Sequence, residues 1–497
     1  MNKASLLLCN KNQKIFLLAI LLISFALRIN RLDYPMSYTF AWGDGARDYL
    51  VASHIVRYGE FPLTGPYNLL EESGIKGSPI YFYILALPLL VYNHPLTLGL
   101  INIFLQVLVL VLIFLIAREA FDTPTALMAL TFFSFNPEII KQSDYIWQPY
   151  LMMPLAYFSL YLFVRAIFRK NYRLLFLSLT VATLSFAIHN SAFPYLIVLL
   201  AASIIVVKLK RKNFYYYFGL LFSILLPTAI LHLPVVLTSG GIKAFPTQNI
   251  FGFINNLNFN LDSFLNTFYV NKLFLAVLLL LSTLLYYLKR NHFLLGALVL
   301  FLTPLILASF FDKIRFHYLM LSSGIFAIII AYLLTHLKPL ALKLLLFCLI
   351  LWIFSGNLQF IKDFKKPFEN QKIINQITQK IVSELPEPYS FQVKSYAKDL
   401  SADRQDKSTF DYPVLDTILL VPLEERLKVK LARVSDENSY NHVQINEKDY
   451  IVLACYKFHT NMDSDCREDF LKDNRDYNVI KTLYISEYIS IYLTKIL

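Results

Sequence analysis

The chain has 497 residues, of which 57% are hydrophobic and only 16% are charged. A soluble domain carries about 25% charged residues, so this composition excludes an ordinary water-soluble protein and predicts that lipid is the main solvent. The formal net charge is +12, and its basic clusters lie in short breaks between apolar runs, where positive charge marks the cytosolic side of a membrane. Nucleic-acid binding is therefore not implied.

Apolar runs close to the length needed to cross a bilayer recur from residue 15 to residue 356. We expect an all-α polytopic membrane bundle of about 11 spans, with roughly 11 to 13 compatible with the pattern. The expected spans are 15–30, 96–117, 125–136, 150–168, 174–188, 193–207, 214–233, 273–288, 294–310, 317–334 and 340–356. A further run, 79–92, is shorter, and we expect it to form a re-entrant or interfacial helix instead.

The basic clusters also predict the orientation in the cell membrane. A cytosolic N-terminus places the loop 32–78, the loop 234–271 and the C-terminal domain on the extracytoplasmic side. In this topology no acidic side chain before residue 357 lies in the middle of the membrane. Because ion-coupled pumps usually carry such residues, an outward-facing polar site on the bundle is the better interpretation.

The apolar pattern stops after Gly356, which divides the chain into two predicted domains. Residues 1–356 form the transmembrane domain, with the large first extracytoplasmic loop at 32–78. Residues 357–497 form a small soluble α/β domain outside the membrane.

Within the second domain we expect an amphipathic helix around 371–383 and strands at 450–458 and 485–497. Cys455 and Cys466 also fall here. An extracytoplasmic location allows either a disulfide bridge between them or two free thiols.

The first extracytoplasmic loop carries two acids at helical spacing. The stretch from Trp42 to Tyr49 leads into a segment of helical character, with Asp44 at its start and Asp48 one turn later. Either Asp44 is an N-cap, whose charge suits the helix dipole, or it is a carboxylate held at the membrane surface for chemistry. Asp48 by itself is typical of a solvated residue or of a partner for a nearby arginine.

Cations stand at two places where the chain enters the membrane from outside. Lys76 lies in the segment Lys-Gly-Ser-Pro-Ile-Tyr (76–81), and alone it is typical of a lysine whose amine reaches the interface. Arg315 and His317 open a late span. Such an arginine can bind a lipid phosphate of any kind or simply anchor the helix.

Three further polar residues lie at external turns. Glu138 and Asp144 occupy the turn 136–149 together with an interfacial tryptophan, and His189 ends another span. A histidine in this place is more often hydrogen-bonded at a helix end than used as a ligand. No group of residues has firm metal-ligand spacing.

The order of these segments resembles that of the C-type (GT-C) superfamily of membrane glycosyltransferases. Four features follow one another over about residues 15–335: an acid-bearing first loop, Lys-Gly-Ser-Pro-Ile-Tyr, a Ser-Asp-Tyr-Ile-Trp-Gln-Pro turn before a long span, and a late Arg-Phe-His-Tyr segment. This order is similar to that of bacterial and archaeal relatives of protein O-mannosyltransferases and of the lipid A aminoarabinose transferase.

The resemblance implies an inverting transfer at the outer membrane surface. Asp44 matches the position of the acid that takes the proton from the acceptor nucleophile, and Asp48 is kept beside it as a catalytic candidate. Lys76 and Arg315, with His317 next to Arg315, match the positions that bind the phosphate of the leaving group.

In one place the chain departs from the family's pattern. Related transferases often carry an Arg-Pro-Asp turn before the fifth span, where this chain has Trp147, Gln148 and Pro149. The second acidic residue is then either missing or replaced by Asp144 or Glu138, and His189 is kept with them as a candidate for the acceptor site. Some relatives bind a divalent ion and others do not, so metal use stays open, and no cofactor besides the lipid-linked donor is implied.

The function expected from the sequence is a hexosyl- or pentosyltransferase of the cell envelope. Its partners are then the bilayer, a polyprenyl-phosphate-linked sugar, and a protein, lipid or glycan acceptor. There are two alternatives: a ligase or polymerase acting on lipid-linked oligosaccharide, with its chemistry in the loop 234–271, and a lipid or solute transporter without catalysis. The sequence names neither the sugar nor the acceptor.

Overall fold

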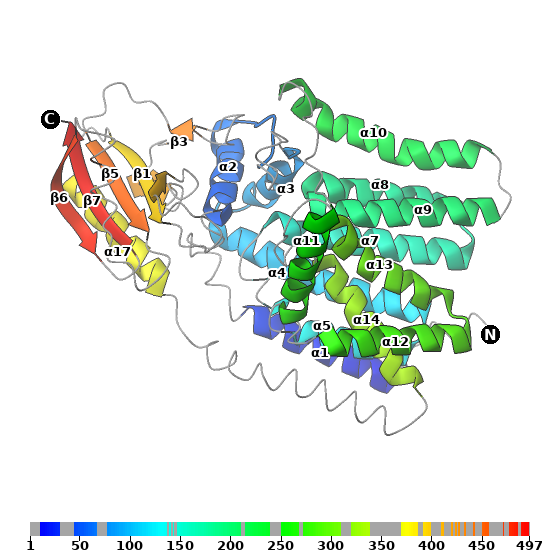
Figure 1. Ribbon diagram of the computed structural model, residues 1–497. Coiled ribbons are helices and arrows are strands. Elements are labelled where there is room, and N and C mark those ends of the chain that lie inside the picture. The colour runs from blue at the N-terminus through cyan, green and yellow to red at the C-terminus, as the bar shows by residue number, and fades with distance from the viewer. Residues whose placement is uncertain are drawn as a thin grey trace. The chain divides into compact units, whose positions relative to one another are not determined.

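In the computed structural model, helices dominate the chain up to residue 337 and a small sheet lies near its end (Figure 1). The structure describes residues 10–29, 44–66, 77–136, 139–140, 143, 147–209, 214–238, 250–267, 272–309, 320–337, 369–385, 391–398, 409–411, 419–420, 423–424, 426–427, 432–433, 441–442, 450–456, 471, 477–485 and 489–496.

Contacts between Cα atoms divide the chain into two units. The first unit comprises Met1–Leu32, Leu63–Tyr81 and Gly99–Lys366, and the second comprises Asp33–Pro62, Phe82–Leu98 and Pro367–Leu497. The helix of the first loop therefore belongs to the same unit as the C-terminal segment. The domain boundary predicted after residue 356 lies outside the described residues.

The long helices coincide with ten of the eleven expected spans. They are α1 (Lys11–Ile29), α4 (Pro95–Ala120), α5 (Thr123–Ser134), α7 (Gln148–Arg169), α8 (Tyr172–Ile188), α9 (Phe193–Leu209), α10 (Phe214–Thr238), α12 (Lys272–Lys289), α13 (His292–Ser309) and α14 (Met320–His336). Among the described residues, five helical stretches are long and apolar enough to cross a membrane; they correspond to α1, α4, α7, α9 and most of α10. The predicted fold class is thus confirmed. The number of spans remains a prediction, since the run 340–356 lies outside the described residues.

Small polar residues let α7 and α8 pack closely. The hydroxyl of Ser159 donates to the carbonyl of Ser178 at 2.8 Å, and the hydroxyl of Ser178 donates to the carbonyl of Ser159 at the same distance. Serines allow close approach between helices in an apolar bundle, and each hydroxyl here finds an acceptor. Helix α8 also lies beside α9 and α10 (Figure 1).

Helix α14 is buried along nearly its whole length. Tyr157 of α7 donates its hydroxyl to the carbonyl of Leu321 at 2.8 Å, and the amide of Gly324 donates to the same hydroxyl at 3.0 Å. Glycine permits this approach, because a Cβ at position 324 would lie 2.8 Å from Cδ1 of Ile113 on α4. Helix α14 is therefore held between α4 and α7.

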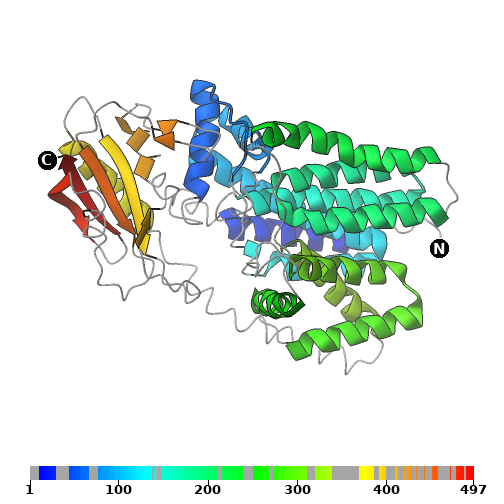
Figure 2. The ribbon, with the colours of Figure 1, turned by 45° about the horizontal axis from the view of Figure 1, so that its top comes forward.

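Helix α11 (Ile250–Thr267) lies in the loop 234–271, where no helix was predicted. It runs across α12 and α13, and Figure 2 shows it end-on while those two helices run in the plane of the picture. The side-chain amides of Asn256 and Asn260 donate to the carbonyl and the hydroxyl of Ser309 at 3.3 and 3.0 Å. Asparagine has low helix propensity, so these tertiary contacts with α13 stabilise a helix that local preference does not favour.

Helix α3 (Ile80–Leu89) occupies the run 79–92 and has 10 residues. That number rises about 15 Å, roughly half the thickness of the hydrocarbon core. The length agrees with the expectation that this run does not cross the membrane.

The C-terminal part of the second unit contains a sheet and a helix. Helix α17 (Glu369–Glu384) precedes β1 (Phe391–Lys398), β2 (Thr409–Asp411), β3 (Ala432–Arg433), β4 (Asn441–His442), β5 (Tyr450–Tyr456), β6 (Tyr477–Ile485) and β7 (Ile489–Ile496). The five-stranded sheet has the order β2-β1-β5-β7-β6, in which only β1 and β5 are parallel neighbours; β3 and β4 pair separately.

One face of this sheet carries an apolar cluster. Ile451 and Leu453 of β5 alternate onto the same face and pack with Tyr492 of β7. Helix α17, β5 and β7 occupy the segments for which a helix and two strands were predicted. Cys466 lies outside the described residues, so the disulfide question stays open.

Candidate functional site

Helix α2 (Asp44–Tyr58) carries both acids of the first loop and begins at Asp44, as the sequence predicts. All residues from Ala46 to Ile55 are buried, which is unlike a solvated surface helix. The N-terminal end of a helix favours negative charge, so position 44 suits a carboxylate. The side chain of Asp44 lies outside the described part of the chain, and its catalytic role stays a prediction.

Asp48 is fully buried and paired with its neighbour Arg47. The Nε and Nη2 atoms of Arg47 lie 2.9 and 2.7 Å from Oδ1 of Asp48. Charge-assisted hydrogen bonds of this length fix the orientation of a carboxylate. Asp48 was interpreted either as a solvated residue or as the partner of a nearby arginine. The structure agrees with the arginine partner and not with the solvated residue.

A second charged cluster on α2 escaped the sequence analysis. Both ring nitrogens of His54 contact carboxylates: Nδ1 lies 3.0 Å from Oε2 of Glu60, and Nε2 lies 2.9 Å from Oε2 of Glu424. His54 and Glu424 are almost fully buried. The only signal in the sequence was a glutamate directly after a run of aliphatic residues, which does not reveal its partner.

The loop that contains Lys76 is closed by backbone hydrogen bonds at its two ends. The amide of Gly65 donates to the carbonyl of Gly77 at 2.7 Å, and the amide of Gly77 donates to the carbonyl of Pro66 at 3.1 Å. A Cβ at position 65 would lie 2.9 Å from the carbonyl carbon of Gly77, so only glycine allows this approach. The backbone that directly follows Lys76 is therefore fixed, although Lys76 itself is outside the described residues.

The end of the same loop is attached to α10. The hydroxyl of Ser78 donates to the carbonyl of Leu231 at 2.9 Å. His232, the residue after Leu231 on α10, places its ring centroid 5.5 Å from that of Phe186 on α8. Its Nε2 is shielded from solvent and has no hydrogen-bond partner among the described residues. A buried polar atom without a partner calls for an explanation, and a bound ligand is one.

His189 is hydrogen-bonded at a helix end, which is the structural role that its place in the sequence favours. It follows α8, is buried, and accepts a hydrogen bond at Nδ1 from the amide of Ser191 at 3.3 Å. The hydroxyl of Ser191 lies 2.8 Å from the same nitrogen. His189 thus caps the short 3₁₀ turn Asn190–Ala192, and an acceptor-binding role for it stays a prediction.

The remaining predicted site residues lie outside the described part of the chain; they are Lys76, Glu138, Asp144, Arg315 and His317. Among the described residues, no group of three or more His, Cys, Asp or Glu side chains could hold a metal ion. Whether the chain uses a metal therefore stays open.

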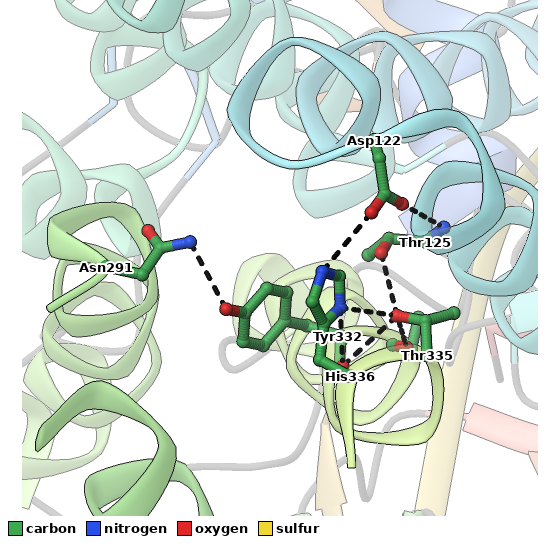
Figure 3. A network of polar contacts seen from close by, with 7 residues as sticks. Asp122, Thr125, Asn291, Tyr332, Thr335 and His336 are labelled. Carbon is green, nitrogen blue, oxygen red and sulfur yellow. Dashed lines mark hydrogen bonds and ion pairs between the residues drawn. The ribbon is translucent and has the colours of Figure 1, made fainter. Parts of the chain in front are cut away.

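A further polar network lies at the end of α14 away from residues 315–317. Asp122 caps α5 by accepting from the amide of Thr125 at 2.8 Å, and it pairs with Nε2 of His336 at 3.3 Å. Figure 3 shows these groups together with Thr335 and Tyr332. The 17 residues of α14 separate its two ends by about 25 Å, so this network is not part of the predicted phosphate site.

The network changes the acidity of Asp122. Burial would raise the pKa of its carboxyl, but hydrogen bonds from His336 and Thr125 outweigh this and lower the pKa to about 2. Asp122 is therefore ionised at neutral pH and fastens the turn between α4 and α5 to the end of α14.

Comparison with known proteins rests on structure alone. No family model matches the sequence, and no curated protein gives a significant match. Among solved structures, ArnT from Cupriavidus metallidurans bound to undecaprenyl phosphate is 10% identical, with a TM-score of 0.58 over 96% of this chain and 97% of ArnT. The apo state of ArnT is also 10% identical, with a TM-score of 0.55 over 90% of this chain and 93% of ArnT.

A weaker likeness exists to the archaeal oligosaccharyltransferase AglB from Archaeoglobus fulgidus, in complex with an inhibitory peptide and a dolichol-phosphate. It is 13% identical, with a TM-score of 0.44 over 80% of this chain and 61% of AglB, which is too low to support an argument. At 10% identity the likeness to ArnT shows the fold. The chain therefore has the fold of ArnT, the lipid A aminoarabinose transferase of the GT-C superfamily, and the predicted resemblance is confirmed at this level.

Proposed function

We propose that this membrane protein is an inverting glycosyltransferase that moves a sugar from a polyprenyl-phosphate carrier to an acceptor on the extracytoplasmic face. The observation that carries the proposal is the fold shared with ArnT over nearly the whole chain, in a structure that contains undecaprenyl phosphate. Fold alone does not define a reaction, so the roles of individual residues rest on the motifs of the sequence.

In the proposed reaction, Asp44 takes the proton of the acceptor hydroxyl as its oxygen attacks the anomeric carbon of the sugar. The new bond joins that oxygen to the anomeric carbon. The bond between the anomeric carbon and the phosphate oxygen breaks, and the polyprenyl phosphate leaves with the bonding electrons. Lys76 and Arg315, assisted by His317, stabilise the negative charge that grows on the phosphate.

The anchored end of the first loop supports the role of Lys76. Hydrogen bonds from Gly65 to Gly77 and from Ser78 to Leu231 fix the backbone just after the lysine. A fixed cation needs no reorganisation when charge develops. We add His232 to the proposed donor site, because its unpartnered Nε2 lies one residue from the point where this loop meets α10. Such an imidazole nitrogen can hydrogen-bond a phosphate oxygen or a sugar hydroxyl.

Basic residues at helix ends support the proposed topology. The turns that join α7 to α8 and α12 to α13 lie at the same end of the first unit (Figure 1), and they carry Lys170 and Arg290. The positive-inside rule assigns that end to the cytosol. We accordingly propose a cytosolic N-terminus and an extracytoplasmic C-terminal domain.

The decisive experiment combines a panel of polyprenyl-phosphate sugars with the Asp44→Asn variant. We expect purified wild-type protein to glycosylate an envelope fraction from one donor, and the variant to lose at least about 100-fold in rate, since a general base contributes 10²–10⁴-fold. The matched control is Asp262→Asn, an exposed acid of α11 whose ion pair with Lys272 has no assigned role. Retention of most activity by Asp44→Asn would remove the assigned base.

Other results would favour the two alternatives. Sensitivity to substitution that maps to residues 234–271, with a tolerant Asp44, would indicate a ligase or polymerase of lipid-linked oligosaccharide. Movement of labelled lipid across proteoliposomes without a new glycosidic bond would indicate a transporter.

A further inference from the structure

A buried histidine joins helix α2 to the C-terminal segment within the second unit. His54 lies between Glu60, which follows α2, and Glu424, which belongs to the C-terminal segment; its Nδ1 and Nε2 are 3.0 and 2.9 Å from the two carboxylates. The side chains of His54 and Glu424 are 1% and 3% exposed, and that of Glu60 is 19% exposed. Water therefore reaches this cluster mainly at Glu60.

The two contacts use both nitrogens of the imidazole. An ionised carboxylate only accepts hydrogen bonds, and an imidazole nitrogen that carries a hydrogen donates to it. Through its two nitrogens His54 contacts two different segments of the second unit.

The position of Glu424 is not that of a surface residue that meets a partner by chance. Leu419, Leu420 and Leu423, close to Glu424 in the chain, are also buried. Burying a carboxylate beside apolar residues is costly unless it is paired and hydrogen-bonded. The contact with His54 contributes to meeting that requirement.

Other titratable groups face the same cluster. The ring of Tyr58 meets His54 edge-on at 4.9 Å. Burial, and after it the charge of Glu424, raise the pKa of Tyr58, while Arg57 lowers it. Tyr58 therefore stays neutral in the physiological range and adds no negative charge to the cluster.

We infer that His54 is a positioning residue. It attaches α2, the helix that begins with Asp44, to Glu424, so the C-terminal segment takes part in positioning the helix that carries the proposed base. This inference rests on the proposed function, because it assigns a purpose to α2 within that reaction. A second tether points the same way, since the hydroxyl of Tyr49 lies 3.1 Å from Oδ1 of Asn93 on the segment that follows α3.

The first test measures attachment without any enzyme assay. Hydrogen exchange of residues 44–58 is followed in full-length wild-type protein, His54→Gln, Glu424→Gln and the double variant, all in lipid nanodiscs. We expect Glu424→Gln alone to speed exchange in α2 about tenfold, and to add little when His54 is already replaced. The matched control is Glu384→Gln, which removes an exposed ion pair with Lys481 in the same unit and should leave α2 unchanged. Additive effects of the two substitutions, or unchanged exchange in Glu424→Gln, would contradict the attachment of α2 to Glu424 through His54.

The second test measures transfer. For Glu424→Gln we expect kcat to fall about tenfold with little change in the KM of the donor, because a displaced base loses rate rather than binding. His54→Lys should keep most of kcat, because a lysine amine also donates to carboxylates. An unchanged kcat in Glu424→Gln would overturn the positioning role. If the His54 and Glu424 substitutions have non-additive effects on exchange in α2, but the wild-type protein transfers sugar from no donor, the attachment would be supported and the proposed function refuted.

Discussion

Glu424 lies 370 residues after His54 in the chain, yet its carboxylate is 2.9 Å from the imidazole. The residue that completes this contact comes from the segment that, by sequence, forms a separate soluble domain. Helix α2 and the C-terminal sheet therefore belong to one structural unit. Substitutions far along the chain are expected to affect α2 directly.

The pH dependence of stability should reveal the role of Asp122. Its pKa of about 2 is below the ordinary value of 3.8, so its contribution is present above about pH 4 and is lost as the pH falls towards 2. We expect Asp122→Asn to lower the free energy of unfolding by about 1 kcal/mol at pH 7, through the weakened cap of α5 and the lost ion pair. Apparent Tm values in detergent should differ between variant and wild type at pH 7 and converge near pH 2. A constant difference over this range would contradict the assignment.

Replacement of Gly65 by alanine should disturb the loop that carries Lys76. The new Cβ would lie 2.9 Å from the carbonyl carbon of Gly77, so the backbone pair must separate. We expect Gly65→Ala to raise the donor KM about tenfold, since it displaces the backbone next to the lysine that we propose to bind the phosphate. Gly296→Ala is the control, because a Cβ there meets nothing within 4 Å and alanine favours the helix. Equal kinetics for the two variants would show that this loop does not position the donor.

Packing around α14 predicts a loss of stability that is independent of chemistry. In Gly324→Ala the added methyl meets the hydroxyl of Tyr157 and Cδ1 of Ile113. Overpacking of this kind costs about 1–3 kcal/mol, so the apparent Tm should fall. Combining it with Ile113→Val, which removes the contacting methyl, should restore part of the loss. Failure of the second substitution to help would mean that the strain lies at Tyr157 alone.

His232 offers a test of the donor site itself. In His232→Phe the ring keeps its contact with Phe186 but loses both nitrogens. We expect the donor KM to rise about tenfold, as for a lost hydrogen bond to a charged group. The apparent Tm should stay equal or rise, because a buried polar atom without a protein partner is removed. An unchanged KM with a lowered Tm would assign His232 a structural role instead.

Much of the architecture was predictable because it depends on local properties of the chain. Apolar runs have to become helices in lipid, where each backbone group must be satisfied within its own segment. The start of α2 at Asp44 and the shortness of α3 follow from the sequence in the same way. Helix α11 was missed because contacts of Asn256 and Asn260 with Ser309 stabilise it, and such contacts leave no local pattern.

The sequence by itself determined that the chain lies in a membrane, that its long apolar runs are helical, and which superfamily the order of its motifs resembles. Only the tertiary structure decided that Asp48 is paired with Arg47, that Gly65 closes the loop onto Gly77, and that His54 meets Glu424. The physical reason is the range of the interactions. Hydrophobic period and helix signals act within a few turns, whereas a buried charge is stabilised by whichever partner the fold brings near it.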